Sequence, residues 1–154
     1  MSSTFKTLLA ASLTVWTASL VAQPFSLVAQ PFRAAEGVQK TTNDGVYSKA
    51  QADGAKARFD KICAECHAFT VAAKKKPKDL PLGDEPFVQD WDGRALGELI
   101  TTIVLTMPND GSAVVSDPEA VDLVAYILQQ NGFPAGSAPL TKEGASDVVF
   151  RARK

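Results

Sequence analysis

The 154-residue sequence contains few of the side chains that usually bind metals or cofactors: one histidine, two cysteines and two methionines, one of which is Met1. A single histidine, His67, cannot build a metal site of several imidazoles, and any Ser-His-Asp hydrolase would depend on it alone. The sequence also lacks a basic excess, with 16 Lys and Arg against 17 Asp and Glu, which argues against a nucleic-acid-binding protein. Its 45% hydrophobic and 21% charged residues are typical of one soluble globular domain.

The N-terminal stretch has the pattern of a secretory signal. Lys6 precedes an uncharged apolar run over residues 8–22, which is shorter than the about 20 residues that span a bilayer. The heptapeptide SLVAQPF occurs twice in succession and offers cleavage points after Ala22 and after Ala29. We therefore expect an exported, periplasmic protein in which residues 1–29 form the signal and the duplicated segment. Membrane attachment would require that the signal stays uncleaved.

The rest of the chain predicts a small all-α domain. Apolar residues recur at helical spacing over residues 48–63, 93–105 and 116–131. The predicted N-caps are Ser48, Asp92 and Ser116, the last with Glu119 in a capping box. Residues 68–90 are rich in lysine and proline and are expected to form a loop. We expect a polar lead-in over 30–47, a domain over 48–134 and a C-terminal tail over 135–154, and no segment shows the alternation of a strand.

Residues 63–67 read Cys-Ala-Glu-Cys-His, the C-x-x-C-H pattern of covalent haem attachment. Thiols three positions apart can form thioethers to the two vinyl groups of one porphyrin, and His67 then lies under the iron as its proximal ligand. Two alternatives use the same residues. A thioredoxin-type redox pair would need a βαβ context that the sequence lacks, and a zinc site would need a fourth ligand. The sequence predicts one haem c bound through Cys63 and Cys66.

Met107 is the predicted sixth ligand of the iron. Once His67 occupies the proximal side, the chain holds no second histidine and no free thiolate. Met107 lies just beyond the second predicted helix, where Pro108 stops the helix from continuing. The alternative is that Met107 is an ordinary core residue. The His/Met pair is the established ligation of cytochromes c, which favours the ligand role.

These features resemble a class I cytochrome c of the bacterial periplasmic type, over about residues 46–134. In that family an aromatic residue four positions before the first cysteine packs on a Leu-x-x-Tyr pair of the last helix, and Phe59, Leu123 and Tyr126 match it. The family's glycine at the helix crossing is replaced by Ala55, with Gly54 beside it. The resemblance implies an all-α, cytochrome c-like fold of three main helices around one covalently attached haem, with a wider or shifted crossing. Gly54 weakens the helix, so we expect it to have a close packing partner.

The resemblance also implies a proline whose carbonyl accepts the Nδ1 proton of the proximal histidine. Pro81, followed by Leu82, is the expected residue, and Pro77 is its competitor. Residues 68–79 depart from the glycine-rich loop of the family. Pro81 and Leu82 are therefore candidate pocket residues for the haem, next to His67 in space.

Three further residues have two interpretations. Phe87, Trp91 and Arg94 are expected near the haem edge, where an indole N–H and a guanidinium can bind propionates. In the alternative, Trp91 packs in the core and Arg94 covers a surface. The lysine run over residues 74–78 is a solvated loop by default, or a patch that steers an acidic redox partner.

The resemblance implies an electron carrier with no catalytic acid, base or nucleophile. Its partners would be a redox protein donor and acceptor, and related cytochromes often serve quinoprotein alcohol or aldose dehydrogenases. We expect a monomer that binds no nucleic acid. The competing functions are a haem enzyme or gas sensor with an open distal site, and a thiol-disulfide protein using Cys63 and Cys66.

Overall fold

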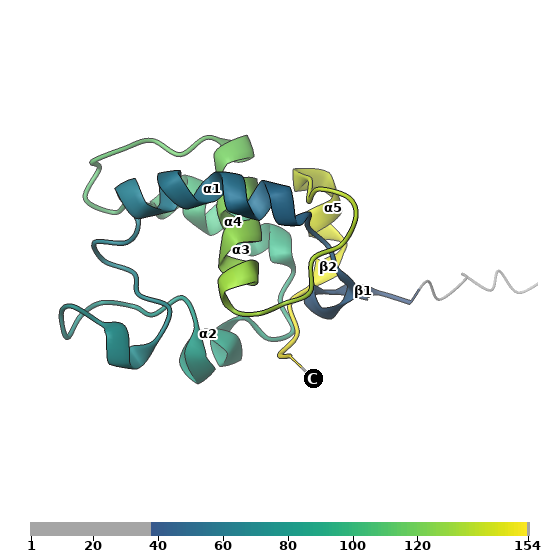
Figure 1. The fold of residues 1–154 in the computed structure, drawn as a ribbon, viewed down its shortest axis with the longest axis horizontal. Helices are drawn as coiled ribbons and strands as arrows, with labels where there is room; N and C mark the ends of the chain where they lie inside the picture. Colours follow the sequence, from purple (N-terminus) through teal and green to yellow (C-terminus); the bar gives the residue numbers. More distant parts are fainter. Residues whose placement is uncertain (1–37, 154) are drawn as a thin grey trace, which may run out of the picture. The chain divides into compact units, whose positions relative to one another are not determined.

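The computed structural model describes residues 38–153, so the expected signal segment lies outside the described residues. Within them the chain forms five α-helices, two 3-10 helices and two short strands (Figure 1). In order these are β1 (Lys40–Thr41), η1 (Thr42–Asp44), α1 (Lys49–Ile62), η2 (Val71–Ala73), α2 (Asp84–Trp91), α3 (Leu96–Thr106), α4 (Asp117–Gln130), α5 (Lys142–Ser146) and β2 (Val148–Val149). The expected all-α class is confirmed. Among the described helices, none is long and apolar enough to cross a membrane.

The core forms where α1 crosses α4 (Figure 1). Both helices begin at the predicted N-caps. The Ser48 hydroxyl accepts the N–H of Gln51, and the Glu119 carboxylate accepts the N–H of Ser116 at 2.9 Å. These bonds satisfy donors that the first turn of a helix leaves free. From α4 the core receives Ala120, Val121, Leu123, Val124, Ala125, Tyr126, Ile127 and Leu128.

The alanines of α1, and not Gly54, lie in the core. Ala52 and Ala55 are 0% and 5% exposed. A Cβ added at Gly54 would meet nothing within 4 Å, because this position of α1 faces solvent. The expectation that Gly54 has a close packing partner is therefore wrong.

Two helix boundaries differ from the prediction. Residues 68–90 were expected to form a loop, but α2 begins at Asp84, where two acidic residues in the first turn favour a helix N-terminus. The helix expected over 93–105 begins at Leu96, because Gly93 adopts a left-handed conformation with φ of 86°. Asp92 does not cap it; its carboxylate instead accepts the N–H of Ala152 and pairs with Arg151.

Residues 135–154 were expected to form a tail, but most of this segment is folded onto the domain. Strand β2 pairs in parallel with β1, with Lys40 opposite Val148 (Figure 1). Phe150 is 0% exposed, and its N–H donates to the carbonyl of Arg94 at 2.8 Å. The expected polar lead-in is likewise partly buried at Thr42, whose hydroxyl donates to the Arg151 carbonyl. A two-residue strand is too short to produce the alternation by which strands are predicted.

The lead-in and the segment after α4 are joined at Tyr47. The Tyr47 hydroxyl donates to the Phe133 carbonyl at 2.7 Å, and the Gly136 N–H donates to the Tyr47 carbonyl at 2.7 Å. A Cβ at Gly136 would collide with the Gly45 carbonyl. Only glycine allows the two backbones to approach this closely.

Candidate functional site

The C-x-x-C-H motif begins where α1 ends. The N–H of Cys63 still donates to the Phe59 carbonyl at 2.9 Å, as in a helix. The Cys63 carbonyl then accepts both the Cys66 N–H at 3.1 Å and the His67 N–H at 2.9 Å. The motif is thus folded into one compact turn that continues from a rigid helix. Both cysteines are free, Cys63 half-buried and Cys66 exposed.

The imidazole of His67 is oriented by one backbone carbonyl. Its Nδ1 lies 2.8 Å from the carbonyl oxygen of Leu80. A carbonyl oxygen only accepts, so Nδ1 carries the proton and Nε2 keeps its lone pair for a metal. Metal-binding histidines commonly donate their second N–H in this way, which fixes the tautomer and the ring.

The acceptor was expected to be Pro81, and this is wrong by one residue. The carbonyl that reaches His67 belongs to Leu80, which precedes Pro81, because a following proline holds a residue in an extended conformation. The N–H of Leu82 donates to the Ala68 carbonyl at 2.8 Å, which places this segment beside the residues after the motif. Leu82 itself is half-buried against the core.

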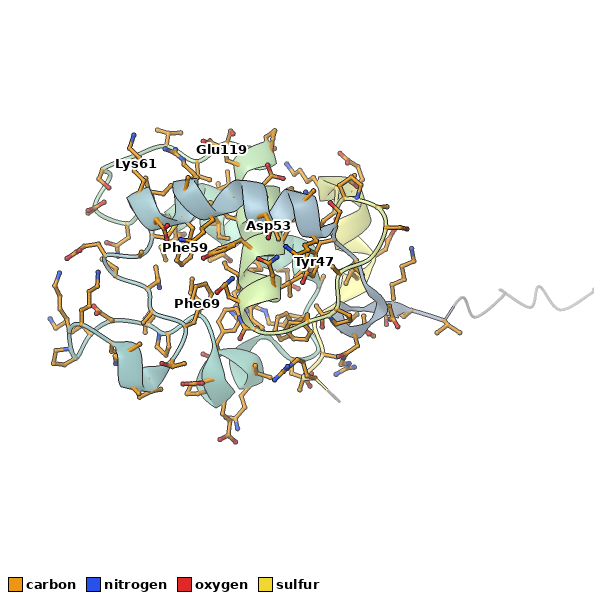
Figure 2. All side chains as sticks on the ribbon, viewed as in Figure 1. Tyr47, Asp53, Phe59, Lys61, Phe69 and Glu119 are labelled. Atoms are coloured by element: carbon orange, nitrogen blue, oxygen red, sulfur yellow. The ribbon has the colours of Figure 1, made fainter. Side chains whose placement is uncertain are left out.

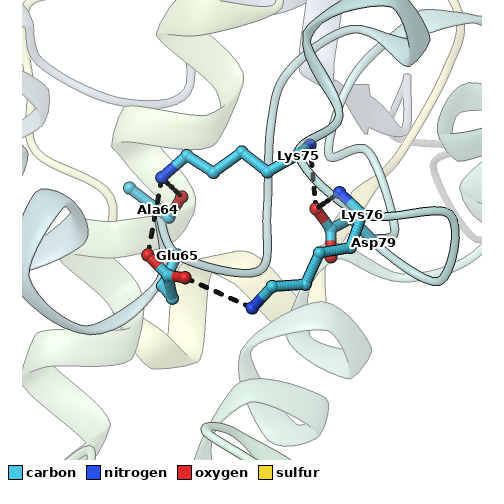
Figure 3. A network of polar contacts seen from close by, with 5 residues as sticks. All are labelled: Ala64, Glu65, Lys75, Lys76 and Asp79. Carbon is cyan, nitrogen blue, oxygen red and sulfur yellow. Dashed lines mark hydrogen bonds and ion pairs between the residues drawn. The ribbon is translucent and has the colours of Figure 1, made fainter.

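The lysine loop is attached to the C-x-x-C-H turn (Figure 3). The Asp79 carboxylate is 7% exposed and accepts the N–H groups of Lys75 at 3.0 Å and Lys76 at 2.7 Å. The ammonium of Lys75 donates to the Ala64 carbonyl at 3.1 Å, and that of Lys76 pairs with Glu65 at 3.2 Å. This loop is therefore more than a solvated run of charge, because two of its lysines contact the C-x-x-C-H turn.

Met107 follows α3 directly. Its N–H donates to the Ile103 carbonyl at 3.0 Å, but its own backbone is extended, with φ of −121° and ψ of 143°. The helix therefore ends where predicted, ahead of Pro108, and the Met107–Pro108 peptide is cis. The Met107 side chain is half-buried and packs against the core.

Three aromatic rings form one cluster, of which Phe59 and Phe69 are labelled in Figure 2. Phe59 lies 5.1 Å from Tyr126 between ring centroids, as the resemblance implies. Phe69 stacks on Phe59 at 5.1 Å and meets Tyr126 edge-on at 5.9 Å. Phe69 was not predicted from the sequence, although its place two residues after His67 is a usable signal for a ring near the motif.

Phe87, Trp91 and Arg94 have partners within the chain. Phe87 is buried and contacts the ring of Phe150 edge-on at 5.8 Å. The guanidinium of Arg94 stacks 4.0 Å over the Trp91 ring and donates to the Glu98 carboxylate at 2.9 Å. These contacts agree with the interpretation in which Trp91 packs in the core and Arg94 covers a surface.

The Cys63 thiol is unsuited to thiol-disulfide chemistry. Burial raises its pKa to about 11, against the opposing effect of the nearby positive charge of Arg58. Exchange requires a thiolate, so catalytic cysteines have a lowered pKa. The environment of Cys63 raises the pKa instead and so disfavours the thiolate. Within the part of the chain that the structure describes, no group of three or more His, Cys, Asp or Glu side chains is placed to hold a metal ion, as a zinc site would need.

The donor set fits a covalently attached haem. It combines two free thiols in one turn, an imidazole with Nε2 available, a thioether beyond a second helix and an aromatic cluster. Together with the all-α fold, these features define a c-type cytochrome domain, which binds haem c.

A comparison with protein families supports this class. The family described as cytochrome c oxidase, cbb3-type, subunit III matches residues 50–127, and the chain belongs to this family. The match includes α1 except its first residue, the motif, Met107 and most of α4. Searches of curated proteins and of solved structures found no significant match.

Proposed function

We propose that this chain is an exported, monohaem cytochrome c that carries single electrons between a dehydrogenase-type donor and a respiratory acceptor. The proposal depends mainly on His67, which belongs to the C-x-x-C-H turn at the end of α1. Its Nδ1–H donates to the carbonyl of Leu80, which leaves Nε2 available for the iron. When bound, haem c supplies a one-electron Fe(III)/Fe(II) couple. One histidine and two cysteines in the sequence match the needs of a single haem.

Each residue has a defined task in this proposal. The thiols of Cys63 and Cys66 each add across one vinyl group: the S–H bond breaks, sulfur bonds to one vinyl carbon and hydrogen to the other, with no net oxidation. His67 provides Nε2, and the Leu80 carbonyl holds its ring. Met107 would hold the haem iron through its thioether, which would favour Fe(II) and raise the reduction potential. The aromatic cluster excludes water from one side of the site.

We further propose that the protein acts as a monomer in the periplasm and that a quinoprotein dehydrogenase is its donor. The N-terminal pattern of a secretory signal supports export. The family's description as a subunit of a cytochrome c oxidase supports a respiratory acceptor. Mixing the oxidised protein with such a dehydrogenase and its substrate should reduce the haem, and mixing the reduced protein with such an oxidase should oxidise it. Following the haem oxidation state in the two mixtures tests each partner separately.

The attachment of haem is tested with the chain produced beside a cytochrome c maturation system. The wild type should keep its haem through acid extraction and give a pyridine haemochrome spectrum of a thioether-bound haem. Changing Cys63 or Cys66 to Ser should leave one thioether, and the double change should leave no covalent haem. Wild-type protein without covalent haem would contradict the proposal.

Ligation by Met107 separates the carrier from a haem enzyme or gas sensor. The oxidised wild type should show the weak sulfur-to-iron absorption band, and the reduced form should bind CO slowly. Met107→Ala should remove the band, admit CO rapidly and lower the potential, whereas Met107→His should keep six ligands and still lower the potential. A wild type that lacks the band and binds CO rapidly would favour the open-site alternative.

A further inference from the structure

Arg58 connects the haem-attachment helix with the loop that follows Met107. It lies on α1, five residues before Cys63. Its Nη2 donates to the Val114 carbonyl at 3.0 Å, and its Nε lies 3.0 Å from a carboxylate oxygen of Glu119 (labelled in Figure 2). The two contacts, one hydrogen bond and one ion pair, use two nitrogens of one planar guanidinium, which a lysine cannot reproduce.

The loop over residues 107–115 has few other attachments. Its internal bonds are short-range turns, from Gly111 to Pro108 and from Ser112 to Asp110. Within this loop only Val115, at its end, is fully buried, at 3% exposed, while Met107 at its start packs half-buried against the core. Among the described residues, Arg58 is the single side chain outside this loop that hydrogen bonds to it.

Glu119 anchors the second contact of Arg58 to the scaffold. One of its carboxylate oxygens accepts the N–H of Ser116 at 2.9 Å and the hydroxyl at 2.8 Å, which caps α4. The other oxygen faces Arg58. A single carboxylate thus fixes the start of α4, the end of the loop and the guanidinium together.

We propose that Arg58 is a positioning residue that keeps the 107–115 loop closed, so that Met107 stays on the haem iron. The inference rests on the proposed function of Met107 as axial ligand. Closure matters because an external ligand can bind the iron only after Met107 leaves, and Met107 leaves more often when its loop opens. Arg58 therefore limits the access of other ligands without touching the haem.

The test compares Arg58→Met with Lys56→Met in haem-loaded, oxidised protein. Lys56 lies on the same helix and pairs with Asp60, away from the loop, so its replacement removes an equal charge. Imidazole is the probe, and its association rate reports how often Met107 dissociates. Arg58→Met should raise this rate about tenfold, as expected for the loss of a hydrogen bond from a charged donor. Lys56→Met should leave the rate within about twofold, since exposed ion pairs contribute little.

Amide hydrogen exchange of Gly111 to Val115 provides a readout that does not depend on the iron. These amides should exchange faster in Arg58→Met, while those of α4 stay unchanged; a merely structural role would accelerate both. Arg58→Lys keeps the charge but cannot contact Val114 and Glu119 at the same time, so it should raise the imidazole rate and the amide exchange by less than Arg58→Met does. If Arg58→Met folds poorly, the same two measurements on Arg58→Lys test the proposal.

The failures of the two proposals are distinguishable. If the wild type lacks the sulfur-to-iron band, Met107 is not the ligand, and loop exchange alone judges Arg58. Equal imidazole rates and equal loop exchange in Arg58→Met and Lys56→Met would overturn the role of Arg58, whatever the ligand is.

Discussion

The helical scaffold and the two segments that follow Cys66 and Met107 are held by different forces. Where α1 crosses α4, the buried core is apolar, and side chains such as Ala52, Leu123 and Leu128 are at most 1% exposed. Polar contacts between these helices, such as that of Gln51 with Asp122, involve side chains outside this apolar core. The segments after Cys66 and after Met107 are instead held by hydrogen bonds to backbone carbonyls and carboxylates. Burial of apolar area provides the stability of the scaffold, while directed polar contacts fix the positions of His67 and of the loop after Met107.

The strongest test of this comparison sets two stacked rings against each other. Phe59 is 3% exposed in the scaffold, and Phe69 is half-buried on the loop. Phe59→Ala should lower the free energy of unfolding of the haem-loaded protein by about 3–5 kcal/mol. Phe69→Ala should cost roughly half as much, because less of its area is buried. Chemical denaturation measures both, and equal losses would mean that the loop is as much a part of the core as α1.

Asp79 tests the polar side of the comparison. Asp79→Ala leaves the N–H groups of Lys75 and Lys76 without their acceptor and should cost about 2 kcal/mol. Asp79→Asn keeps one acceptor oxygen and should cost less. Exchange of the two lysine amides should accelerate in the same order. If Asp79→Ala lowers the free energy of unfolding no more than removal of an exposed charge such as that of Lys49, the buried carboxylate does not hold the loop.

The same division explains what the sequence could predict. The helices α1 and α4 were found because helical periodicity and N-cap residues such as Ser48 and Ser116 are local signals. The C-x-x-C-H turn was found because its chemistry fixes its spacing. The acceptor Leu80 was missed by one residue, since the sequence marks a nearby proline but not the direction in which a carbonyl points.

Contacts between distant segments left no local signal. Arg58 meets Val114 across 56 residues of chain, and an arginine on a helix usually indicates only an exposed face. Phe150 completes the core from a segment whose glycine, proline and serine content indicated a tail. The lead-in and the C-terminal segment also contact each other, through the bond from Thr42 to Arg151 and the pairing of β1 with β2.

Tyr47 tests the scaffold through pH. Burial raises the pKa of its hydroxyl above the ordinary 10.0, and the negative charge of Asp53 adds to this effect. The unfolded chain loses this proton near pH 10 and the folded chain at higher pH, so the stabilisation is complete below pH 10.0 and is lost as pH rises through the raised value. Tyr47→Phe should cost about 1 kcal/mol near pH 7, by removing the bond to Phe133. As pH rises through 10.0 and above, the wild type should lose more stability than Tyr47→Phe. Unfolding measured at each pH tests this, and parallel losses would contradict the role of Tyr47.

The smallest expected effect compares an exposed glycine with a packed glycine on two helices of the scaffold. Gly54 lies within α1 with open space where a Cβ would be, so Gly54→Ala should stabilise the protein by about 0.8 kcal/mol through helix propensity alone. Gly97 of α3 is the matched control, because a Cβ there would lie 3.1 Å from the Ser146 hydroxyl oxygen and 3.3 Å from the Ser146 Cα. Gly97→Ala should therefore gain less than Gly54→Ala or lose stability. Thermal unfolding of both variants decides the matter: a loss in Gly54→Ala would mean that the outer face of α1 has a partner, and that the scaffold is not closed by α4 alone.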